Sequence, residues 1–274
     1  MSEQTRLSAD LTGKTALVTG SVQGIGLAIA ESLAKAGARI AVHGIAGDAQ
    51  IEEVCHHLLA VGAPQAEFFS GDLRQPERIA ELMQAVAAWG GTDILVNNAG
   101  IQQTGSLAEL STETWDAILA INLSAAFHTM QAAMPGMAQR GHGRVINIAS
   151  VQGLVGSKDK APYVAAKHGL VGLSKVAALE YAARGDKALG AVTVNCICPG
   201  WTNTTLIEPQ VAARAAKFDG DLDAATADLM KEKQPSLRAS DPSEIGALAL
   251  WLCDPVAHNV TGTAIPVDGG WTAQ

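Results

Sequence analysis

The chain has 274 residues, of which 48% are hydrophobic and 17% charged, and its formal net charge at pH 7 is −8. This length and apolar content are typical of one globular α/β domain spanning residues 1–274. The acidic balance, without a run rich in Lys or Arg, argues against nucleic acids and anionic membrane surfaces as partners. The polar start and the lack of an apolar run of about 18 residues predict a cytoplasmic protein, with no signal peptide and no membrane span. The isolated cysteines and histidines predict neither disulfides nor a metal site.

Short β-branched runs alternate with Ala- and Leu-rich segments of helical period along the chain, which predicts a parallel sheet with crossover helices. We expect seven strands, at Thr15–Thr19, Arg39–His43, Ala66–Gly71, Ile94–Asn97, Arg144–Ile148, Thr193–Ile197 and Ala264–Val267. The expected helices are Ile25–Ala36, Ala49–Val61, Pro76–Trp89, Thr112–Gln139, Tyr163–Ala183 and Pro242–Cys253. The predicted fold is a single doubly wound, Rossmann-type α/β domain with its ligand site along the carboxyl ends of the strands.

One segment, Trp201–Asp241, is mixed in polarity and lies between the sixth strand and the last helix. Long insertions at the ligand end of a sheet often form lids, so we expect a substrate lid with short helices here. A surface excursion without a role is the alternative. The segment Ala182–Ala191 is also several residues longer than expected, and we expect it to extend a surface loop or a subunit contact.

Three glycines lie at the turn from the first strand to the first helix, in Thr19–Gly26, which reads TGSVQGIG. Gly20 permits a tight turn, Gly24 allows the backbone to approach a pyrophosphate, and Gly26 allows the helix to pack closely on the strand. The amino end of the following helix then faces the anion. The turn predicts a dinucleotide site.

Further motifs follow this turn in a set order. They are Asn97–Gly100 after the fourth strand, Asn122 in the next helix, Ser150 at the end of the fifth strand, Tyr163 and Lys167 in the sixth helix, and Pro199–Gly200 after the sixth strand. Together with the G-x-x-x-G-x-G spacing, they resemble the short-chain dehydrogenase/reductase family. The resemblance implies an oxidoreductase that transfers hydride between a nicotinamide dinucleotide and a small molecule.

Four residues are candidate catalytic groups. Tyr163 and Lys167 are spaced i and i+4, so they share one helix face, and the ammonium can favour the phenolate form of the tyrosine. The resemblance implies that Tyr163 acts as acid and base, that Ser150 binds the reacting oxygen, and that Asn122 anchors a water joined to Lys167. A strand-end serine that caps a helix and a solvated Tyr–Lys pair would be the structural alternative.

The cofactor is expected to be NAD. The segment Ala41–Ile45 and the glycine-rich turn contain neither the acidic residue typical of NAD enzymes nor the Arg or Lys that binds a 2′-phosphate, so NADP would lack a strong cation. Asp72 and Leu73 resemble the family's adenine clamp, although Asp72 could instead cap the next helix. The implied cofactor-binding residues are Gly20, Gln23, Gly24, Ile25, Gly26, Asp72, Leu73, Asn98, Ala99, Gly100, Tyr163, Lys167, Pro199, Gly200, Thr202 and Thr204.

Several segments resemble the branch of the family that contains the bacterial D-3-hydroxybutyrate dehydrogenases. They are Asn97–Gln102, Trp115–Ala125, Tyr163–Gly169, Ile197–Trp201, Glu232–Leu237 and Asp268–Ala273. The resemblance implies reversible, NAD-dependent oxidation of (R)-3-hydroxybutyrate or a similar short 3-hydroxy acid, by a homotetramer. The implied substrate-binding residues are Gln102, Ser150, Gln152, Lys160, Tyr163, Trp201, Gln210 and Trp271.

One departure from this branch leaves the substrate open. Gln152 stands where a histidine is common, and its amide can donate a hydrogen bond but cannot carry a positive charge. A neutral polyol, sugar or ketone is therefore an alternative substrate. A dinucleotide-binding sensor without catalysis is a more distant alternative, disfavoured because all four catalytic positions are filled.

Overall fold

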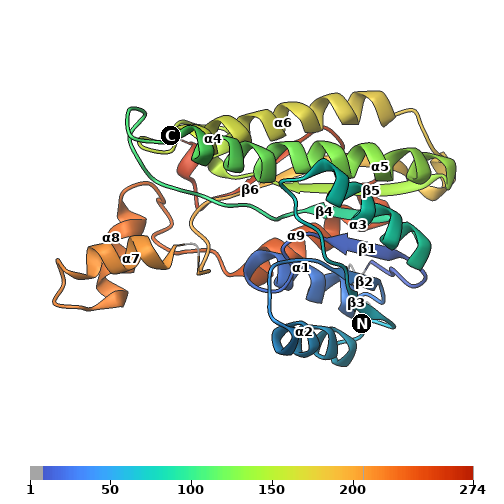
Figure 1. Ribbon diagram of the computed structural model, residues 1–274, viewed down its shortest axis with the longest axis horizontal. Coiled ribbons are helices and arrows are strands. Elements are labelled where there is room, and N and C mark those ends of the chain that lie inside the picture. Colours follow the sequence, from blue (N-terminus) through green and yellow to red (C-terminus); the bar gives the residue numbers. More distant parts are fainter. Residues whose placement is uncertain (1–8, 206, 274) are drawn as a thin grey trace, which may run out of the picture.

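A computed structural model describes residues 9–205 and 207–273 (Figure 1). The polar start that predicts no signal peptide falls largely on residues 1–8, which lie outside the described residues. Seven parallel strands form one sheet in the order β3-β2-β1-β4-β5-β6-β7. They are β1 Thr15–Val18, β2 Arg39–Val42, β3 Ala66–Phe68, β4 Ile94–Asn97, β5 His142–Ile148, β6 Ala191–Pro199 and β7 Ala264–Val267. The predicted seven-stranded, doubly wound sheet is confirmed.

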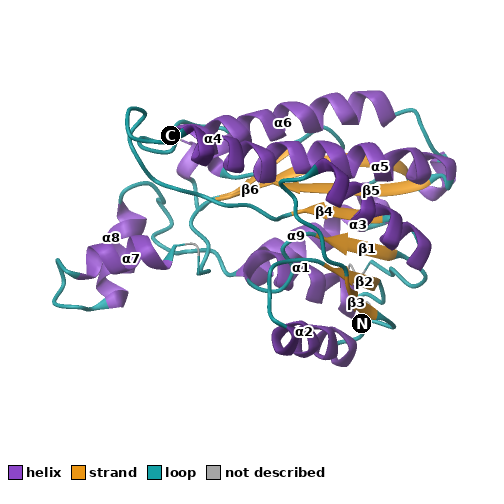
Figure 2. Cartoon of the chain, viewed as in Figure 1, coloured by secondary structure: helices purple, strands orange, loops and turns teal. Residues whose placement is uncertain are grey.

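Helices cover both faces of this sheet (Figure 2). They are α1 Gly24–Lys35, α2 Asp48–Ala60, α3 Pro76–Trp89, α4 Thr112–Leu119, α5 Ala125–Gln139, α6 Ala161–Tyr181, α7 Glu208–Ala215, α8 Leu222–Lys231 and α9 Pro242–Cys253. Side chains of α1, α2 and α9 form one buried cluster with the strands, and side chains of α3, α5 and α6 form a second. Two apolar layers therefore sandwich strands that are buried on both faces, which explains their nearly continuous apolar sequence.

The strand order reverses beside β1, because the chain runs outward through β2 and β3 and then returns to place β4 on the other side of β1. Val18 of β1 pairs with Val42 of β2 on one side and with Val96 of β4 on the other. The loops that leave β1 and β4 therefore diverge at their carboxyl ends. Such a switch point opens a crevice where ligands bind in open α/β sheets.

The predicted helix Thr112–Gln139 is not regular throughout, because a π-helical turn at Ala120–Ser124 separates α4 from α5. Thr112–Gln139 is also long and apolar enough, by length and composition, to cross a membrane, unlike the sequence-based expectation. However, 44% of its most apolar window is buried inside the protein, and α5 packs against α3 and β5. Part of the apolar surface of this stretch therefore belongs to the core, which includes Met130, Met134 and Met137.

The lid segment, residues 201–241, contains the expected short helices. α7 and α8 pack on each other through an apolar cluster of their own, which includes Val211 and Leu229. In Figure 1 both helices project away from the sheet beyond the carboxyl ends of its strands. The lid therefore has its own small core.

The long loop between α6 and β6 is held by buried polar groups. Arg144 is almost fully buried in β5, and its Nη1 donates to the carbonyl oxygens of Gly190 and Ala191 at 3.1 and 3.0 Å. The ring Nδ1 of His142 lies 2.8 Å from the carbonyl oxygen of Leu189. The extra residues are thus bound to the amino ends of β5 and β6, at the end of the sheet opposite the ligand crevice. Their contact with another subunit remains a prediction.

Buried polar side chains connect α5, the central strands and α6. Asn97 donates to Asn147 at 2.8 Å, Asn147 donates to Ser174 at 2.7 Å, and the thiol of Cys196 lies 3.0 Å from the Ser174 hydroxyl. Thr129 donates to Asn97 at 2.7 Å. Cys196 and the other three cysteines are free thiols, as the sequence predicts.

Ser174→Ala should lower the free energy of unfolding by about 1–3 kcal/mol, because the amide of Asn147 would lose its hydroxyl partner inside the core. Chemical denaturation measures this loss. Ser32→Ala is the matched control. The Ser32 hydroxyl donates to the carbonyl oxygen of Ala28, four residues earlier, at 2.9 Å, and among the described residues it has no side-chain partner. Equal losses of unfolding free energy in both variants would contradict a stabilising role for the hydrogen bond between Asn147 and Ser174.

Candidate active site

The glycine-rich turn has the geometry that its sequence predicts. Gly20 and Gly24 have φ angles of 65° and 58°, in the left-handed region that favours glycine. A Cβ at Gly26 would collide with the carbonyl oxygen of Gly20, so α1 can start this close to β1 only with glycine there. The Asn98 amide donates to the carbonyl oxygens of Thr19 and Gly20, at 2.9 and 3.1 Å, and fixes the turn.

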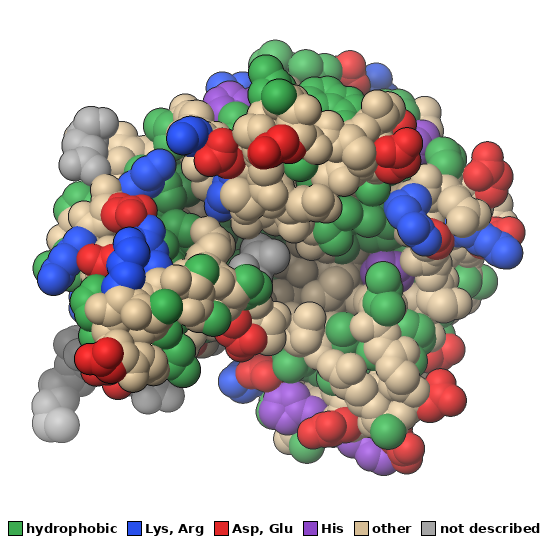
Figure 3. Space-filling view, turned by 60° about the vertical axis from the view of Figure 1, so that its left-hand side comes forward, with side chains coloured by type: hydrophobic (Ala, Val, Ile, Leu, Met, Phe, Trp, Pro, Cys, Tyr) green, Lys and Arg blue, Asp and Glu red, His purple; other side chains and the backbone are tan. Residues whose placement is uncertain are grey.

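A cleft of about 940 Å³ runs along the carboxyl ends of the strands. Figure 3 shows this face of the molecule hollowed near its middle. All the predicted cofactor residues except Gly26, which lies beneath the turn, line the cleft: Gly20, Gln23, Gly24, Ile25, Asp72, Leu73, Asn98, Ala99, Gly100, Tyr163, Lys167, Pro199, Gly200, Thr202 and Thr204. At its floor, the Gln23 side chain does not cap α1, so the first N–H groups of the helix remain available to an anion.

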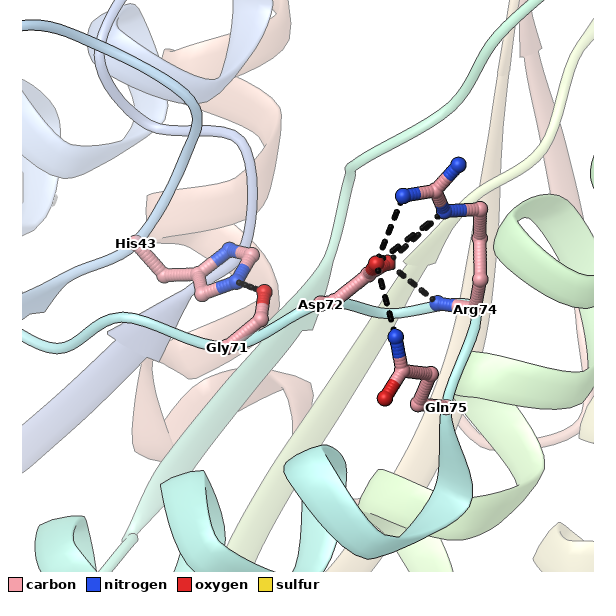
Figure 4. Close-up of polar contacts among 5 residues, drawn as sticks. All are labelled: His43, Gly71, Asp72, Arg74 and Gln75. Atoms are coloured by element: carbon pink, nitrogen blue, oxygen red, sulfur yellow. Dashed lines mark hydrogen bonds and ion pairs between the residues drawn. The ribbon is translucent and has the colours of Figure 1, made fainter.

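Asp72 lies at one end of this cleft and is bound by its own neighbours (Figure 4). Arg74 Nη2 donates to its carboxylate at 2.7 Å, and the Arg74 backbone N–H donates to it at 3.0 Å. The Gln75 amide donates to the same group at 3.3 Å. These hydrogen bonds lower the pKa of Asp72 to about 2. The carboxylate is therefore ionised and lies in the cleft as expected. It does not make the helix-capping contact of the alternative, because its backbone partner, the Arg74 N–H, precedes α3, which begins at Pro76 with Gln75 as its N-cap.

The carboxyl end of β2 carries no cation. His43 is buried between the N–H of Gly20, 3.4 Å from its Nδ1, and the carbonyl oxygen of Gly71, 3.0 Å from its Nε2. Burial lowers the pKa of His43, so its ring is neutral at pH 7. Ile45 follows, with 98% of its surface exposed, and lines the cleft. Sequence reasoning missed Arg74, a cation that lines the cleft but is paired with Asp72.

The residues predicted to be catalytic converge where β5 meets α6. Ser150 lies two residues beyond β5, its hydroxyl accepts the Gln152 backbone N–H at 3.1 Å, and it is close enough to Tyr163 to act on the pKa of the phenol. Lys167 is buried, and its Nζ donates to the carbonyl oxygen of Ile148 at 2.7 Å. The same Nζ lies 5.6 Å from the centre of the Tyr163 ring. A hydroxyl, a phenol and an ammonium thus share one wall of the cleft.

Burial dominates the ionisation of these groups. It raises the pKa of Tyr163 to about 12, although the hydrogen bond from Ser150 acts in the opposite direction. It lowers the pKa of Lys167 to about 8. Desolvation disfavours the charged form of both groups, so the ammonium of Lys167 does not by itself offset the effect of burial on the Tyr163 phenol. A further positive charge in the cleft is needed for Tyr163 to act as a base near neutral pH.

Asn122 occupies the π-helical turn and is bound on both sides of its amide. Its Nδ2 donates to the carbonyl oxygen of Ile101, and its Oδ1 accepts the N–H of Ile101, both at 2.9 Å. A small cavity of about 10 Å³ is lined by Asn122, Lys167, Asn97 and Thr19, among others. This volume is about that needed for one water molecule among polar groups. The water that the resemblance implies between Asn122 and Lys167 remains a prediction.

Two tryptophans and a lysine form a second part of the site. The ring centres of Trp201 and Trp271 lie 5.6 Å apart. Lys160 is only 6% exposed, its Nζ lies 5.4 Å from the centre of the Trp201 ring, and it donates to Gln102 Oε1 at 3.2 Å. Burial, with the charge of Lys233, lowers the pKa of Lys160 to about 8. Gln102 and Trp201 thus contact one desolvated ammonium, and Trp271 packs against Trp201.

The remaining two predicted substrate residues are less closely placed. Gln152 is buried beside Ser150, and its Oε1 has no hydrogen-bond partner among the described residues. Gln210 lies half-buried in α7, and within the described part of the chain its side chain makes no hydrogen bond to Gln102 or Lys160. The structure therefore brings Gln102, Lys160, Trp201 and Trp271 together and leaves Gln210 on the lid.

Sequence reasoning missed Lys233. Its Nζ lies 5.4 Å from the centre of the Trp271 ring, so a second ammonium joins the tryptophan pair from the lid. The segment Glu232–Leu237 is among those that carry the family resemblance, but no property of a single lysine in it signals a ring more than 30 residues away in the chain.

Fold and site together define a dinucleotide-dependent oxidoreductase, and the family model described as short chain dehydrogenase matches residues 14–215. The chain belongs to the short-chain dehydrogenase/reductase family, whose cofactor is NAD or NADP. It is 48% identical to a D-beta-hydroxybutyrate dehydrogenase of Cupriavidus necator, over 96% of this chain and 100% of the relative. A protein of the same name from Rhizobium meliloti is 44% identical, over 95% and 99%. L-sorbose reductase from Gluconobacter frateurii, solved with NADPH and L-sorbose, superposes with a TM-score of 0.89 at 29% identity, over 98% and 100% of the two chains.

Proposed function

We propose that this protein, acting as one domain over residues 1–274, oxidises (R)-3-hydroxybutyrate or a similar short 3-hydroxy acid reversibly to the 3-oxo acid with NAD. The observation that carries the proposal is the buried ammonium of Lys160, which in the described part of the chain donates only to the neutral Gln102. Within the described residues no carboxylate pairs with it. Buried charges are normally paired, so a substrate carboxylate would supply the missing partner.

The reacting end of the acid would lie at Ser150 and Tyr163. The Ser150 hydroxyl donates a hydrogen bond to the substrate oxygen, and Tyr163 Oη accepts the hydroxyl proton as the C3–H hydride leaves. When bound, the oxidised nicotinamide supplies the hydride acceptor and a positive charge that lowers the pKa of Tyr163. Lys167 and the water site at Asn122 would return the proton toward solvent.

The cofactor preference rests on the same reasoning about charge. The β2 end offers the neutral His43 and the exposed, apolar Ile45. The nearby guanidinium of Arg74 is occupied by Asp72 at 2.7 Å. A 2′-phosphate would therefore find no free cation, which favours NAD over NADP.

A neutral polyol or sugar is the second candidate substrate. The observation that favours it is the unpaired Oε1 of Gln152, which can accept a hydrogen bond from a substrate hydroxyl beside Ser150. A carboxylate would instead need the Gln152 amide to turn its Nε2 inward. The buried ammonium of Lys160 favours the acid as substrate, because a hydrogen bond from an ammonium to a carboxylate is stronger than one to a hydroxyl.

A comparison of kcat/KM for (R)-3-hydroxybutyrate and butane-1,3-diol, each with NAD and with NADP, tests the proposal. We expect the acid to exceed the diol by at least about tenfold, the value of one charge-assisted hydrogen bond. We expect NAD to exceed NADP by a similar factor. A preference for the diol would support the neutral-substrate alternative and contradict the first proposal. The cytoplasmic location and the homotetramer remain predictions.

A further inference from the structure

The two tryptophans of the site each carry one ammonium. Trp201 follows β6 and Trp271 follows β7, and their rings are in contact at 5.6 Å. Lys160 lies over the first ring and Lys233 over the second, each with its Nζ 5.4 Å from the ring centre. One lysine comes from the body of the protein and the other from the lid. The positive charge of Lys233 acts on Lys160: after burial, it is the second cause of the lowered pKa of Lys160.

The acidic groups nearest to this pair in the sequence are occupied elsewhere. Glu232 precedes Lys233, but its carboxylate is paired with Arg214. Asp268 precedes Trp271, but it accepts from the Thr272 hydroxyl and N–H at 2.6 and 2.8 Å. Among the described residues, neither lysine has a salt bridge. Two like charges without a counter-ion cost free energy that an anion between them would recover.

Lys233 is held in place by the residues that follow it. Gln234 is almost fully buried, and its Oε1 accepts the backbone N–H of Trp201 at 3.0 Å. The N–H of Ser236 donates to the carbonyl oxygen of Gly269 at 2.9 Å. This segment is therefore tied to the loops that carry both tryptophans, and Lys233 differs from a freely solvated surface lysine.

We propose that Lys233 is a specificity-determining residue that, together with Lys160, binds the carboxylate of a short monocarboxylic hydroxy acid against the Trp201–Trp271 pair. The inference rests on the proposed function. It assigns the lid a direct contact with substrate, because Lys233 follows α8. Gln152 is neutral and supplies no positive charge beside Ser150. The ammonium of Lys233, on the lid, would then supply the positive charge that Gln152 lacks.

Lys233→Met removes the charge and keeps much of the aliphatic stem over Trp271. We expect KM for 3-hydroxybutyrate to rise about tenfold, the loss of one charge-assisted contact at a partly exposed site. We expect kcat to change less than about twofold, and KM for butane-1,3-diol to stay constant. Butyrate, which lacks the reacting hydroxyl, should lose affinity as a competitive inhibitor by the same factor. Lys233→Arg should retain most of the affinity for both acids.

Lys231→Met is the matched control, because Lys231 is exposed at the end of α8 and carries the same charge. Equal KM values in the two methionine variants would overturn the inference. A rise in KM for acid and diol alike would also overturn it, since that result indicates a structural role. If the wild-type protein prefers the diol, the proposed function itself fails, and the two failures are thereby distinguished. Circular dichroism checks that each variant is folded.

Discussion

Tyr163→Phe should reduce kcat for 3-hydroxybutyrate by at least about 10³-fold, within the range that general acid–base catalysis contributes. The substitution removes only the phenolic oxygen, on whose pKa Ser150 acts. Lys167 is not placed to replace it, because its Nζ donates to the carbonyl oxygen of Ile148 at 2.7 Å. Initial rates of NADH formation measure the effect.

Cofactor binding provides the control for this variant. The ring of Tyr163 still lines the cleft when its hydroxyl is removed, so NADH should bind to Tyr163→Phe with a Kd within about threefold of that of the wild type. Fluorescence titration measures this Kd. Turnover close to the wild-type rate would contradict the assignment of the proton transfer to Tyr163, whereas loss of both binding and turnover would point to misfolding.

Lys160→Met should raise KM for 3-hydroxybutyrate by about 10- to 150-fold, because a buried hydrogen bond to a charged group is worth about 1.5–3 kcal/mol. KM for butane-1,3-diol should change by less than about threefold. The larger effect expected here than at Lys233 follows from burial, since Lys160 is 6% exposed and bonded to Gln102. Equal effects on acid and diol would contradict carboxylate recognition.

The pKa of Lys160 gives this prediction a pH dependence with a definite sign. Its pKa is lowered to about 8, first by burial and then by the charge of Lys233. Only the protonated lysine attracts a carboxylate, so KM for the acid should rise as pH increases through 8. The expected increase between pH 7 and 9 is about tenfold. In Lys160→Met this rise should disappear, and a rise that persists would assign it to another group.

The catalytic and dinucleotide motifs could be read from the sequence because their chemistry is local. The glycines of the first turn are required by left-handed φ angles and by the close approach of α1 to β1. Tyr163 and Lys167 share a helix face through their spacing alone. The strands were also predictable, since parallel strands buried on both faces consist of short apolar runs.

Other features depend on contacts between distant segments. Asn122, in the π-helical turn, bonds to the backbone of Ile101, and Lys233 reaches the site through the packing of the lid against Trp271. The raised pKa of Tyr163 is likewise a consequence of burial, which spacing along a helix cannot predict. In each case the deciding partner is more than 10 residues away in the chain or belongs to the assembled core.

Tyr163 as proton acceptor and Lys160 as carboxylate ligand together imply that the protein oxidises a short 3-hydroxy acid with NAD. Product analysis after incubation of the purified protein with (R)-3-hydroxybutyrate and NAD tests this function. We expect acetoacetate and NADH in equal amounts. No NADH from the acid, under conditions in which a neutral polyol or sugar yields it, would show that the substrate is not a 3-hydroxy acid.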